Sequence, residues 1–248
     1  MASAPRMFGD LAPYYDLQYS AKDYGGEVRQ LEALARRYGR SDGTSWLDVA
    51  CGTGRHLEFL RRRHACVGVD VSPEMLRIAR RRLPGIRLVR GDMRTFRLGH
   101  QFDVVSCLFS AVGHLGTEPD LAAAFANFAR HLRPGGVAIV EPWILPSRAQ
   151  SGRLHLLTYQ DPTITLVRLA QSQVRGRHTL IQYRYLIGET GVGIRYLAET
   201  DRGLMVGPPG LTRLMRRAGL RPHFLTHGFT SDRGLLLGVK PRGPGKEG

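Results

Sequence analysis

Short apolar runs alternate with longer amphipathic stretches along the first 140 residues of the chain. The apolar runs indicate buried strands, and the stretches between them place apolar residues every three or four positions, which is typical of helices. This alternation predicts βαβ units and a parallel sheet. The expected strands are 46–50, 65–70, 86–90, 102–108 and 137–141, and the expected helices are 26–39, 54–63, 73–82 and 118–132.

The pattern changes after Pro142, where β-rich runs without a helical period predict antiparallel strands within 153–200. A last helix at 208–219 and a closing edge hairpin at 222–230 and 234–240 follow. The predicted fold is an α/β, Rossmann-like, doubly wound and mostly parallel sheet with a C-terminal antiparallel hairpin and a small inserted antiparallel β subdomain. The expected parts are a cofactor domain (1–144 and 208–240), an inserted segment for substrate binding or oligomerisation (145–207) and a flexible tail (241–248).

The excess of basic residues raises the question of whether the protein binds a negatively charged partner. The chain carries 36 basic against 21 acidic residues, a formal net charge of +15. Arginine clusters such as 61–63 and 80–82 fall in expected helices, which favours solvated helix faces. The alternative is attraction of a polyanion or a phosphorylated small substrate. No basic stripe is interleaved with aromatic residues, which argues against nucleic acid as a partner.

The three cysteines, Cys51, Cys66 and Cys107, are odd in number and lack CxxC spacing. This argues against both a disulfide framework and a zinc site, so no metal is expected. No N-terminal apolar leader and no run of membrane-spanning length is found. The sequence therefore predicts a cytoplasmic protein with reduced cysteines and no membrane partner.

The first motif with chemical content is Asp48-Val-Ala-Cys-Gly-Thr-Gly54, between an expected strand and an expected helix. Gly52 and Gly54 allow a tight turn and close approach of a ligand. The helix N-terminus offers unpaired N–H groups to a phosphate or a carboxylate. Leu57 stands where a dinucleotide-binding GxGxxG loop has its third glycine, which disfavours a dehydrogenase.

Two further motifs follow the next two strands. Asp70, about 20 residues after the glycine loop, could accept both hydroxyls of a ribose. Its alternative is a helix cap, but Ser72 already suits that role. Asp92 could accept the exocyclic amine of an adenine while Met93 packs on the ring; alone, 91–93 could equally be an ordinary turn. Ligands of open α/β sheets bind at the carboxyl ends of strands, where all three motifs fall.

These motifs, together with Leu-Arg-Pro-Gly-Gly at 132–136, resemble motifs I, II, III and the post-motif of class I S-adenosylmethionine (SAM)-dependent methyltransferases. The resemblance implies SAM as cofactor and S-adenosylhomocysteine as product. Gly52 and Gly54 would lie under the methionine part, Asp70 on the ribose, and Asp92 with Met93 at the adenine. The full implied cofactor site is Tyr15, Tyr19, Tyr24, Asp48, Ala50, Cys51, Gly52, Thr53, Gly54, Asp70, Val71, Met75, Gly91, Asp92, Met93, Leu108 and Phe109.

A narrower resemblance extends nearly end to end over the cofactor domain and is poor across 145–215. The chain is similar to the nucleotide-sugar N,N-dimethyltransferases of macrolide amino-sugar biosynthesis, which implies a small-molecule amine acceptor, with a nucleotide attached in that family. The segments that carry it are 91–96, 106–114, 128–136, 140–143 and 232–239, with Tyr15-Asp16, Tyr19 and Lys22-Asp-Tyr24 near the N-terminus.

His114 follows the fourth expected strand and is the candidate catalytic residue, either taking a proton from the amine or orienting it. Its alternative is a loop or helix-capping histidine. An amine is partly neutral near neutral pH, so a strong base is optional, whereas an alcohol would need one. The candidate substrate-binding residues are Ser110, His114, Trp143, Arg168 and Arg233.

Each of the other candidates has a structural alternative. Trp143 could line the pocket or be a core residue. The resemblance suggests that Arg168 and Arg233 bind a pyrophosphate through their guanidinium groups; the alternative is that they lie on the surface. Tyr19 and Tyr24 could close over the sulfonium as a lid, or plug the sheet edge.

Other functions stay open from the sequence. An O-methyltransferase or a non-sugar N-methyltransferase would share every cofactor motif. A SAM- or nucleotide-binding protein without catalysis, or a basic RNA-associated protein, belongs to a different class. Cys107-Leu-Phe-Ser stands where nucleic-acid base methyltransferases have an Asn-Pro-Pro-Tyr-type motif, which argues against methylation of bases. The inserted segment is a candidate for homodimer formation.

Overall fold

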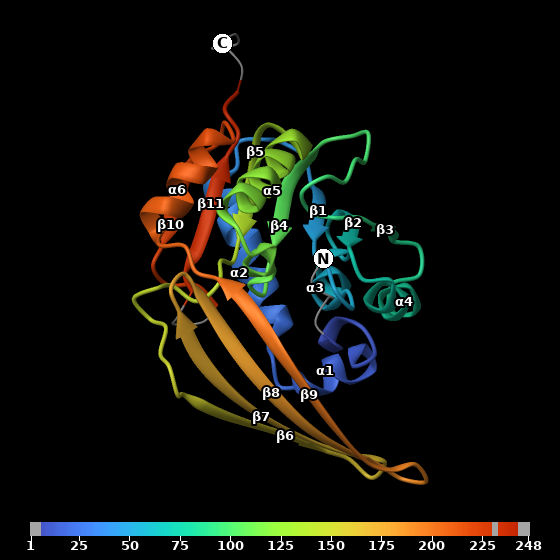
Figure 1. The fold of residues 1–248 in the computed structure, drawn as a ribbon. Coiled ribbons are helices and arrows are strands. Elements are labelled where there is room, and N and C mark those ends of the chain that lie inside the picture. Colours follow the sequence, from blue (N-terminus) through green and yellow to red (C-terminus); the bar gives the residue numbers. More distant parts are fainter. Residues whose placement is uncertain (1–5, 230–232, 243–248) are drawn as a thin grey trace.

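The computed structural model describes residues 6–229 and 233–242 and contains two β-sheets (Figure 1). The larger sheet has seven strands in the order β10-β11-β5-β4-β1-β2-β3. All neighbouring pairs are parallel except those of β11, which runs antiparallel to β10 and β5. Its strands are β1 (Ser45–Val49), β2 (Ala65–Asp70), β3 (Arg87–Arg90), β4 (Phe102–Cys107), β5 (Leu132–Val140), β10 (Arg221–Leu225) and β11 (Leu235–Val239).

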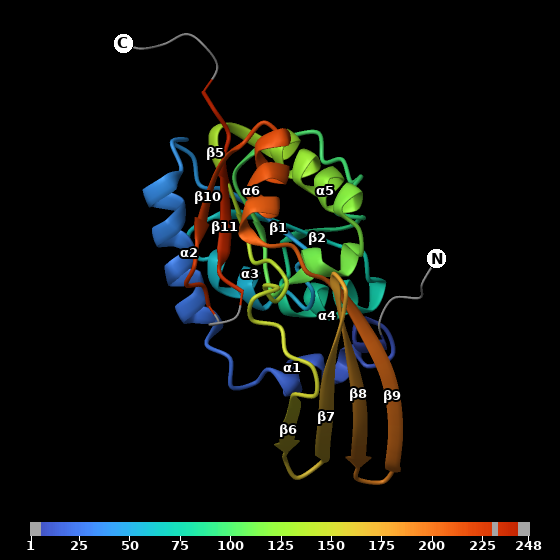
Figure 2. The same ribbon diagram turned by 60° about the vertical axis from the view of Figure 1, so that its left-hand side comes forward.

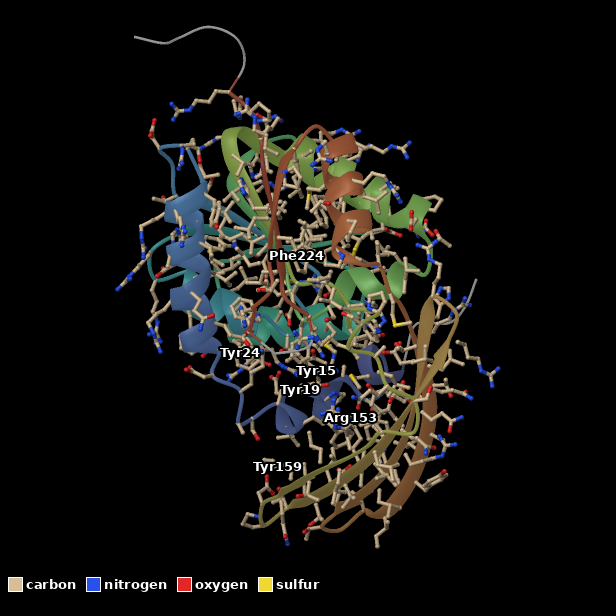
Figure 3. All side chains as sticks on the ribbon, turned by 90° about the vertical axis from the view of Figure 1, so that its left-hand side faces the viewer. Tyr15, Tyr19, Tyr24, Arg153, Tyr159 and Phe224 are labelled. Atoms are coloured by element: carbon tan, nitrogen blue, oxygen red, sulfur yellow. The ribbon has the colours of Figure 1, made fainter. Side chains whose placement is uncertain are left out.

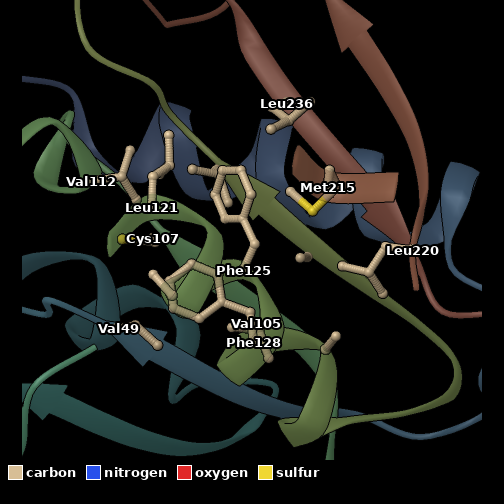
Figure 4. Packing of buried hydrophobic residues seen from close by; sticks show 14 of the residues in the cluster. Val49, Val105, Cys107, Val112, Leu121, Phe125, Phe128, Met215, Leu220 and Leu236 are labelled. Atoms are coloured by element: carbon tan, nitrogen blue, oxygen red, sulfur yellow. The ribbon is translucent and has the colours of Figure 1, made fainter. Parts of the chain in front are cut away.

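Helices cover both faces of the large sheet because its central strands are apolar on both sides. Along β1, Trp46 belongs to one apolar cluster and Leu47 to the other. The first cluster contains residues of α2 (Tyr24–Tyr38), α3 (Arg55–Leu60) and α4 (Pro73–Arg82). The second contains residues of α5 (Glu118–His131) and α6 (Pro208–Arg217), among them Phe125, Phe128 and Met215 (Figure 4).

The second sheet projects from one end of the molecule (Figures 1 and 2). It is antiparallel, with strands β6 (Leu154–Gln160), β7 (Ile164–Arg175), β8 (His178–Glu189) and β9 (Gly193–Leu204) in sequential order. One face packs on the N-terminal segment, where Leu166, Tyr185 and Ile187 meet Met7 and Leu11. The opposite face is exposed and carries several large apolar side chains.

The N-terminal segment folds into three short helical turns: η1 (Arg6–Phe8), η2 (Ala12–Tyr14) and α1 (Tyr15–Gln18). It contacts both sheets. Tyr14 donates its hydroxyl to Glu189 of the second sheet. On the other side, the carbonyl of Phe8 accepts a hydrogen bond from Ser72 Oγ at 2.6 Å. The segment thus joins the second sheet to the cofactor end of the large one.

The predicted fold class is confirmed, and two local predictions are corrected. β5 begins at Leu132, whereas a helix was expected to extend to 132 and the strand to begin at 137. The strand starts early because Leu132 pairs with Phe102 and the Gly135–Gly136 backbone bonds to Lys240. The N-terminal segment, in which no helix was expected before residue 26, is partly helical. The expected edge hairpin is present: β10 is the edge strand, and β11 pairs with both β10 and β5.

Some expectations reach residues that the structure does not describe. The first hairpin strand was expected to extend to Thr230, and the expected tail includes 243–248; both lie outside the described residues. Within the described part, the three cysteines are free and buried, and burial raises the pKa of all three thiols. No helix in that part is both long and apolar enough to cross a membrane.

Candidate active site

The loop from Asp48 to Gly54 leaves β1 through three residues with positive φ: Ala50 (57°), Gly52 (56°) and Gly54 (81°). The two glycines are needed for different reasons. A Cβ on Gly52 would meet nothing within 4 Å, so its backbone is open to a ligand. A Cβ on Gly54 would lie 2.5 Å from Cδ1 of Leu83, so this glycine lets α3 pack against the region of α4.

Asp70 fastens the glycine loop to the end of β2. Its Oδ2 accepts the N–H of Gly52 at 2.7 Å, and its Oδ1 accepts the N–H of Ser72 at 2.8 Å. Burial raises the pKa of Asp70, and the backbone hydrogen bonds partly oppose this rise. The carboxylate is therefore held in a fixed orientation beside the loop, where its remaining lone pairs could accept ribose hydroxyls.

A cleft opens at the carboxyl ends of β1 and β4, next to this loop. In Figure 3, Tyr15, Tyr19 and Tyr24 lie near one another between the large sheet and the second sheet. A backbone loop with an acidic neighbour and tyrosine faces suits a ligand with hydroxyls and a cationic sulfonium, so the cleft fits SAM. The residues that line it are Tyr15, Tyr24, Asp48, Ala50, Cys51, Gly52, Thr53, Arg55, His56, Leu108 and Phe109.

Asp48 lies at the base of the cleft and is 2 % exposed. Its Oδ1 accepts a hydrogen bond from Ser106 Oγ at 2.6 Å. Burial raises the pKa of Asp48 to about 6, which the positive field of His56 partly opposes. Nε2 of His56 lies 2.8 Å from Oε2 of Glu27, whose other oxygen pairs with Lys22.

A strained corner follows β4, where Phe109 (φ 55°) and Ser110 (φ 61°) both adopt the left-handed region. Glu141, the residue directly after β5, stabilises the corner: its Oε2 accepts the N–H of Phe109 at 2.6 Å. Ser110 Oγ donates to the carbonyl of Pro142 at 2.7 Å and is 2 % exposed as a residue. The hydroxyl proton of Ser110, a residue expected to contact substrate, is therefore already used in a hydrogen bond within the fold.

His114 lies on η3 (Ala111–Leu115), which follows this corner. Its ring meets Phe8 and Trp143 edge to face, with centroid distances of 5.3 and 5.2 Å. Its Nδ1 lies 3.2 Å from Oδ1 of Asp201 on β9. Trp143 is 8 % exposed and donates Nε1–H to Thr179 Oγ1 at 2.6 Å, so it is a buried residue that also forms one side of the His114 environment.

The two predicted phosphate-binding arginines come together around one aromatic pair. Tyr19 and Phe109 contact each other edge to face at 4.7 Å. Arg168 from β7 lies 5.7 Å from the Tyr19 ring and donates to the Tyr19 hydroxyl at 3.2 Å. Arg233 lies 5.9 Å from the Phe109 ring and donates to Glu141 at 3.4 Å. Neither arginine is a freely solvated surface group.

The predicted residues around β2 and β3 lie beside the cleft and stay predictions. Val71 is 58 % exposed, whereas Met75 is 1 % exposed within α4. Gly91 donates its N–H to the carbonyl of Asp70 at 2.9 Å. Both carboxylate oxygens of Asp92 accept hydrogen bonds from Arg94, which lowers the pKa of Asp92. Met93 packs against the core.

Sequence reasoning missed several residues that build the site. Asp16 links the N-terminal segment to the glycine loop, accepting from Thr53 Oγ1 at 2.6 Å and from Arg82 at 2.5 Å. Lys22, Asp16 and Glu141 were noted only as parts of motifs, and the acidic residue directly after β5 was a usable signal. Asp201 gave no local signal, because its partner His114 is far away in the sequence.

Comparisons with known proteins agree with this geometry. A family model described as a methyltransferase domain matches residues 47–136. The dTDP-3-amino-3,6-dideoxy-alpha-D-glucopyranose N,N-dimethyltransferase of Streptomyces fradiae is 40 % identical over 97 % of this chain and 93 % of that protein.

Solved structures give the same result. DesVI of Streptomyces venezuelae is 38 % identical, with a TM-score of 0.87 over 93 % of this chain and 98 % of that one. SAM-bound CalS10, an amino pentose methyltransferase from Micromonospora echinaspora involved in calicheamicin biosynthesis, is 35 % identical, with a TM-score of 0.82 over 93 % and 96 %. The chain is therefore a SAM-dependent methyltransferase of class I and belongs to the family of the dTDP-amino-sugar N,N-dimethyltransferases.

Proposed function

We propose that this enzyme transfers methyl groups from SAM to the amino group of a nucleotide-linked amino sugar. The observation that carries the proposal is that similarity to amino-sugar N,N-dimethyltransferases covers nearly the whole chain. It therefore includes the second sheet, whose inner face adjoins His114 through Asp201. Membership of the family itself indicates that the acceptor is a small-molecule amine.

The geometry supports amine methylation at the end of β4. Methyl transfer from a sulfonium needs a lone pair in line with the methyl group, and holding both reactants in this geometry can supply about 7–11 kcal/mol. Phe109 lines the cleft that is proposed to bind the cofactor. His114, which lies on η3 directly after this corner and packs against Trp143, can orient an amine and take a proton from it.

Arg168 and Arg233 are proposed to bind the diphosphate of the acceptor. Both guanidinium groups lie near the Tyr19–Phe109 pair, and the Nε of Arg168 is buried without a hydrogen-bond partner among the described residues. A phosphate oxygen would satisfy such a donor. Tyr19 and Tyr24 are proposed to close over the sulfonium, a role supported by the place of Tyr24 in the cleft wall.

The experiment that tests the function is a turnover assay with three acceptors. Purified protein and SAM are incubated with a TDP-linked amino sugar, with the TDP-sugar that has a hydroxyl in place of the amine, and with the free amino sugar. We expect methylated product by mass spectrometry only from amines, and faster turnover of the nucleotide-linked one. Turnover of the hydroxyl compound alone would contradict the proposal.

A homodimer built on the second sheet is also proposed. The sheet's outer face exposes Leu154, Leu156, Leu169, Leu186, Ile194 and Tyr196. Val167, Leu186 and Tyr196 form one cross-strand row, so the side chains are contiguous across β7, β8 and β9. Contiguous apolar surface of this kind marks interaction sites, and a two-fold pair buries the same patch on both copies.

A further inference from the structure

Asp201 is the acidic group that faces His114 from the second sheet. Its side chain is 9 % exposed, and its Oδ1 lies 3.2 Å from Nδ1 of His114, whose side chain is 24 % exposed. The two atoms are within ion-pair distance, but the N–H is too poorly aligned with the carboxylate oxygen for a hydrogen bond in this structure. Catalytic hydrogen bonds are often long before substrate binds and tighten in the complex.

The surroundings restrict rotation of the His114 ring. Phe8 and Trp143 each approach the ring edge to face. Trp143 is itself fixed: its Nε1–H is bonded to Thr179, and Gly113 and Gly203 pack so closely on the indole that neither position has room for a Cβ. The imidazole therefore presents the same nitrogen to Asp201.

We propose that Asp201 is a positioning residue that holds the proton of His114 on Nδ1 and so keeps the Nε2 lone pair available for the acceptor amine. A neutral imidazole carries one proton, and the hydrogen bond made by one nitrogen decides which nitrogen carries it. A carboxylate accepts but cannot donate, so it selects Nδ1–H. Nε2 makes no hydrogen bond with the described residues, so nothing among them competes with the acceptor.

This role rests on the proposed function. The N–H bond of the acceptor ammonium breaks, its electron pair stays on nitrogen, and the proton moves to Nε2 of His114. Asp201 stabilises the resulting imidazolium. The nitrogen lone pair then forms a bond to the methyl carbon as the carbon–sulfur bond breaks and its electron pair goes to sulfur. The products are a methylated ammonium and a neutral thioether, and His114 returns its proton to solvent.

The tautomer can be measured without turnover. Imidazole ¹⁵N NMR spectra of the cofactor-free protein resolve the nine histidines, and the His114 signals are assigned by their loss in His114→Gln. At a pH where the ring is neutral, we expect Nδ1 to be protonated in the wild type. In Asp201→Ala we expect the proton to move mainly to Nε2. Asp42→Asn, an exposed carboxylate before β1, is the control and should leave the signals unchanged.

Kinetics test whether Asp201 acts through His114. Asp201→Ala should lower kcat about 10- to 100-fold, with the KM for acceptor and the affinity for S-adenosylhomocysteine changed less than about threefold, and Asp201→Glu should recover part of kcat. In a His114→Gln background, Asp201→Ala should have no further effect on kcat. An equal loss of kcat in both backgrounds, or an unprotonated Nδ1 in the wild type, overturns the proposal. If the wild type methylates no amino sugar, the proposed function fails, while the NMR result still decides the tautomer.

Discussion

At the scale of single residues, two buried carboxylates lie close together beside the glycine loop. Asp48 and Asp70 are 2 % and 8 % exposed, and each lies close enough to raise the pKa of the Cys51 thiol between them in the sequence. Both are satisfied by hydrogen bonds from neighbouring groups, Ser106 for Asp48 and two backbone amides for Asp70. A carboxylate that is hydrogen-bonded yet buried is oriented well but is costly to ionise.

This cost gives Asp48 a measurable effect on stability. Because burial raises its pKa from 3.8 to about 6, its contribution to stability is fully present below pH 3.8 and is lost as the pH rises through 6. Asp48→Asn resembles the protonated form and keeps an acceptor for Ser106. Between pH 4 and pH 7 the free energy of unfolding of Asp48→Asn should rise by about 3 kcal/mol relative to the wild type, measured by denaturant titration of the cofactor-free protein. A difference that is constant with pH would contradict this assignment.

Site residues that lie close together in the sequence could be predicted, whereas partners that lie far apart in the sequence could not. Gly52, Gly54 and Asp70 were predictable because a strand–loop–helix unit places them within a short stretch of chain. Asp201 and Asp16 act across the fold, on His114 and on Thr53. Tertiary packing, and no local pattern, brings such partners together, so sequence reasoning could not find their roles. The burial of Ser110 was equally beyond local sequence reasoning, because it depends on how the residues after β5 pack against the corner after β4.

At the scale of elements, the corner after β4 depends on the side chain of Glu141. Two consecutive left-handed residues without glycine are strained, and Glu141 is the acceptor that holds the Phe109 amide in place. Glu141→Ala leaves that amide without its acceptor, so the free energy of unfolding should fall by about 2–3 kcal/mol. Glu141→Gln keeps an acceptor and should cost less. Equal losses in the two variants, measured by denaturant titration, would show that the hydrogen bond does not support the corner.

The N-terminal segment should affect cofactor affinity through Asp16. This carboxylate bridges the side chain of Thr53 in the glycine loop and Arg82 of α4. Loss of these hydrogen bonds in Asp16→Ala should weaken binding of S-adenosylhomocysteine by ~10-fold, measured by calorimetry.

Asp23→Ala is the matched control, since Asp23 caps α2 by accepting the N–H of Gly26 at 2.7 Å. It should cost about 1 kcal/mol of stability and leave the affinity for S-adenosylhomocysteine unchanged. An equal loss of affinity in the two variants would mean that general loosening of the segment, and not the Asp16 bridge, is the cause.

Most helices and strands could be predicted because their apolar residues recur at the regular spacing of a helix or form the short apolar run of a buried strand. The strand at 65–70 and the helix at 73–82 agree with the predicted bounds, and Ser72 caps the helix as expected. The start of β5 was not predictable, because Pro134 and two glycines are locally typical of a turn. There the pairing of Leu132 with Phe102 and the backbone bonds to Lys240 override the local preference.

At the scale of the whole molecule, the outer face of the second sheet is the surface most suited to a second copy. Leu156 on the edge strand β6 and Leu186 on the central strand β8 are 69 % and 50 % exposed. Replacing both with Glu should raise the dimer Kd by ~100-fold or more, because two leucines contribute about 3 kcal/mol or more when buried. Val192→Glu, in the turn between β8 and β9, is the control. A monomeric wild type in light scattering would refute the proposed dimer.

The N-terminal segment also has a kinetic consequence. It closes on the cofactor loop through Asp16 and on the second sheet through Gln18 and Tyr19, which both contact Arg168. In an N,N-dimethyltransferase, spent cofactor is exchanged for fresh cofactor between the two transfers, and an opening of the segment for this exchange would also separate the contacts on the acceptor side. We therefore expect a distributive enzyme that releases the singly methylated sugar. A time course should show this intermediate accumulating before any doubly methylated product, and a small excess of labelled starting sugar should compete with it for the second round.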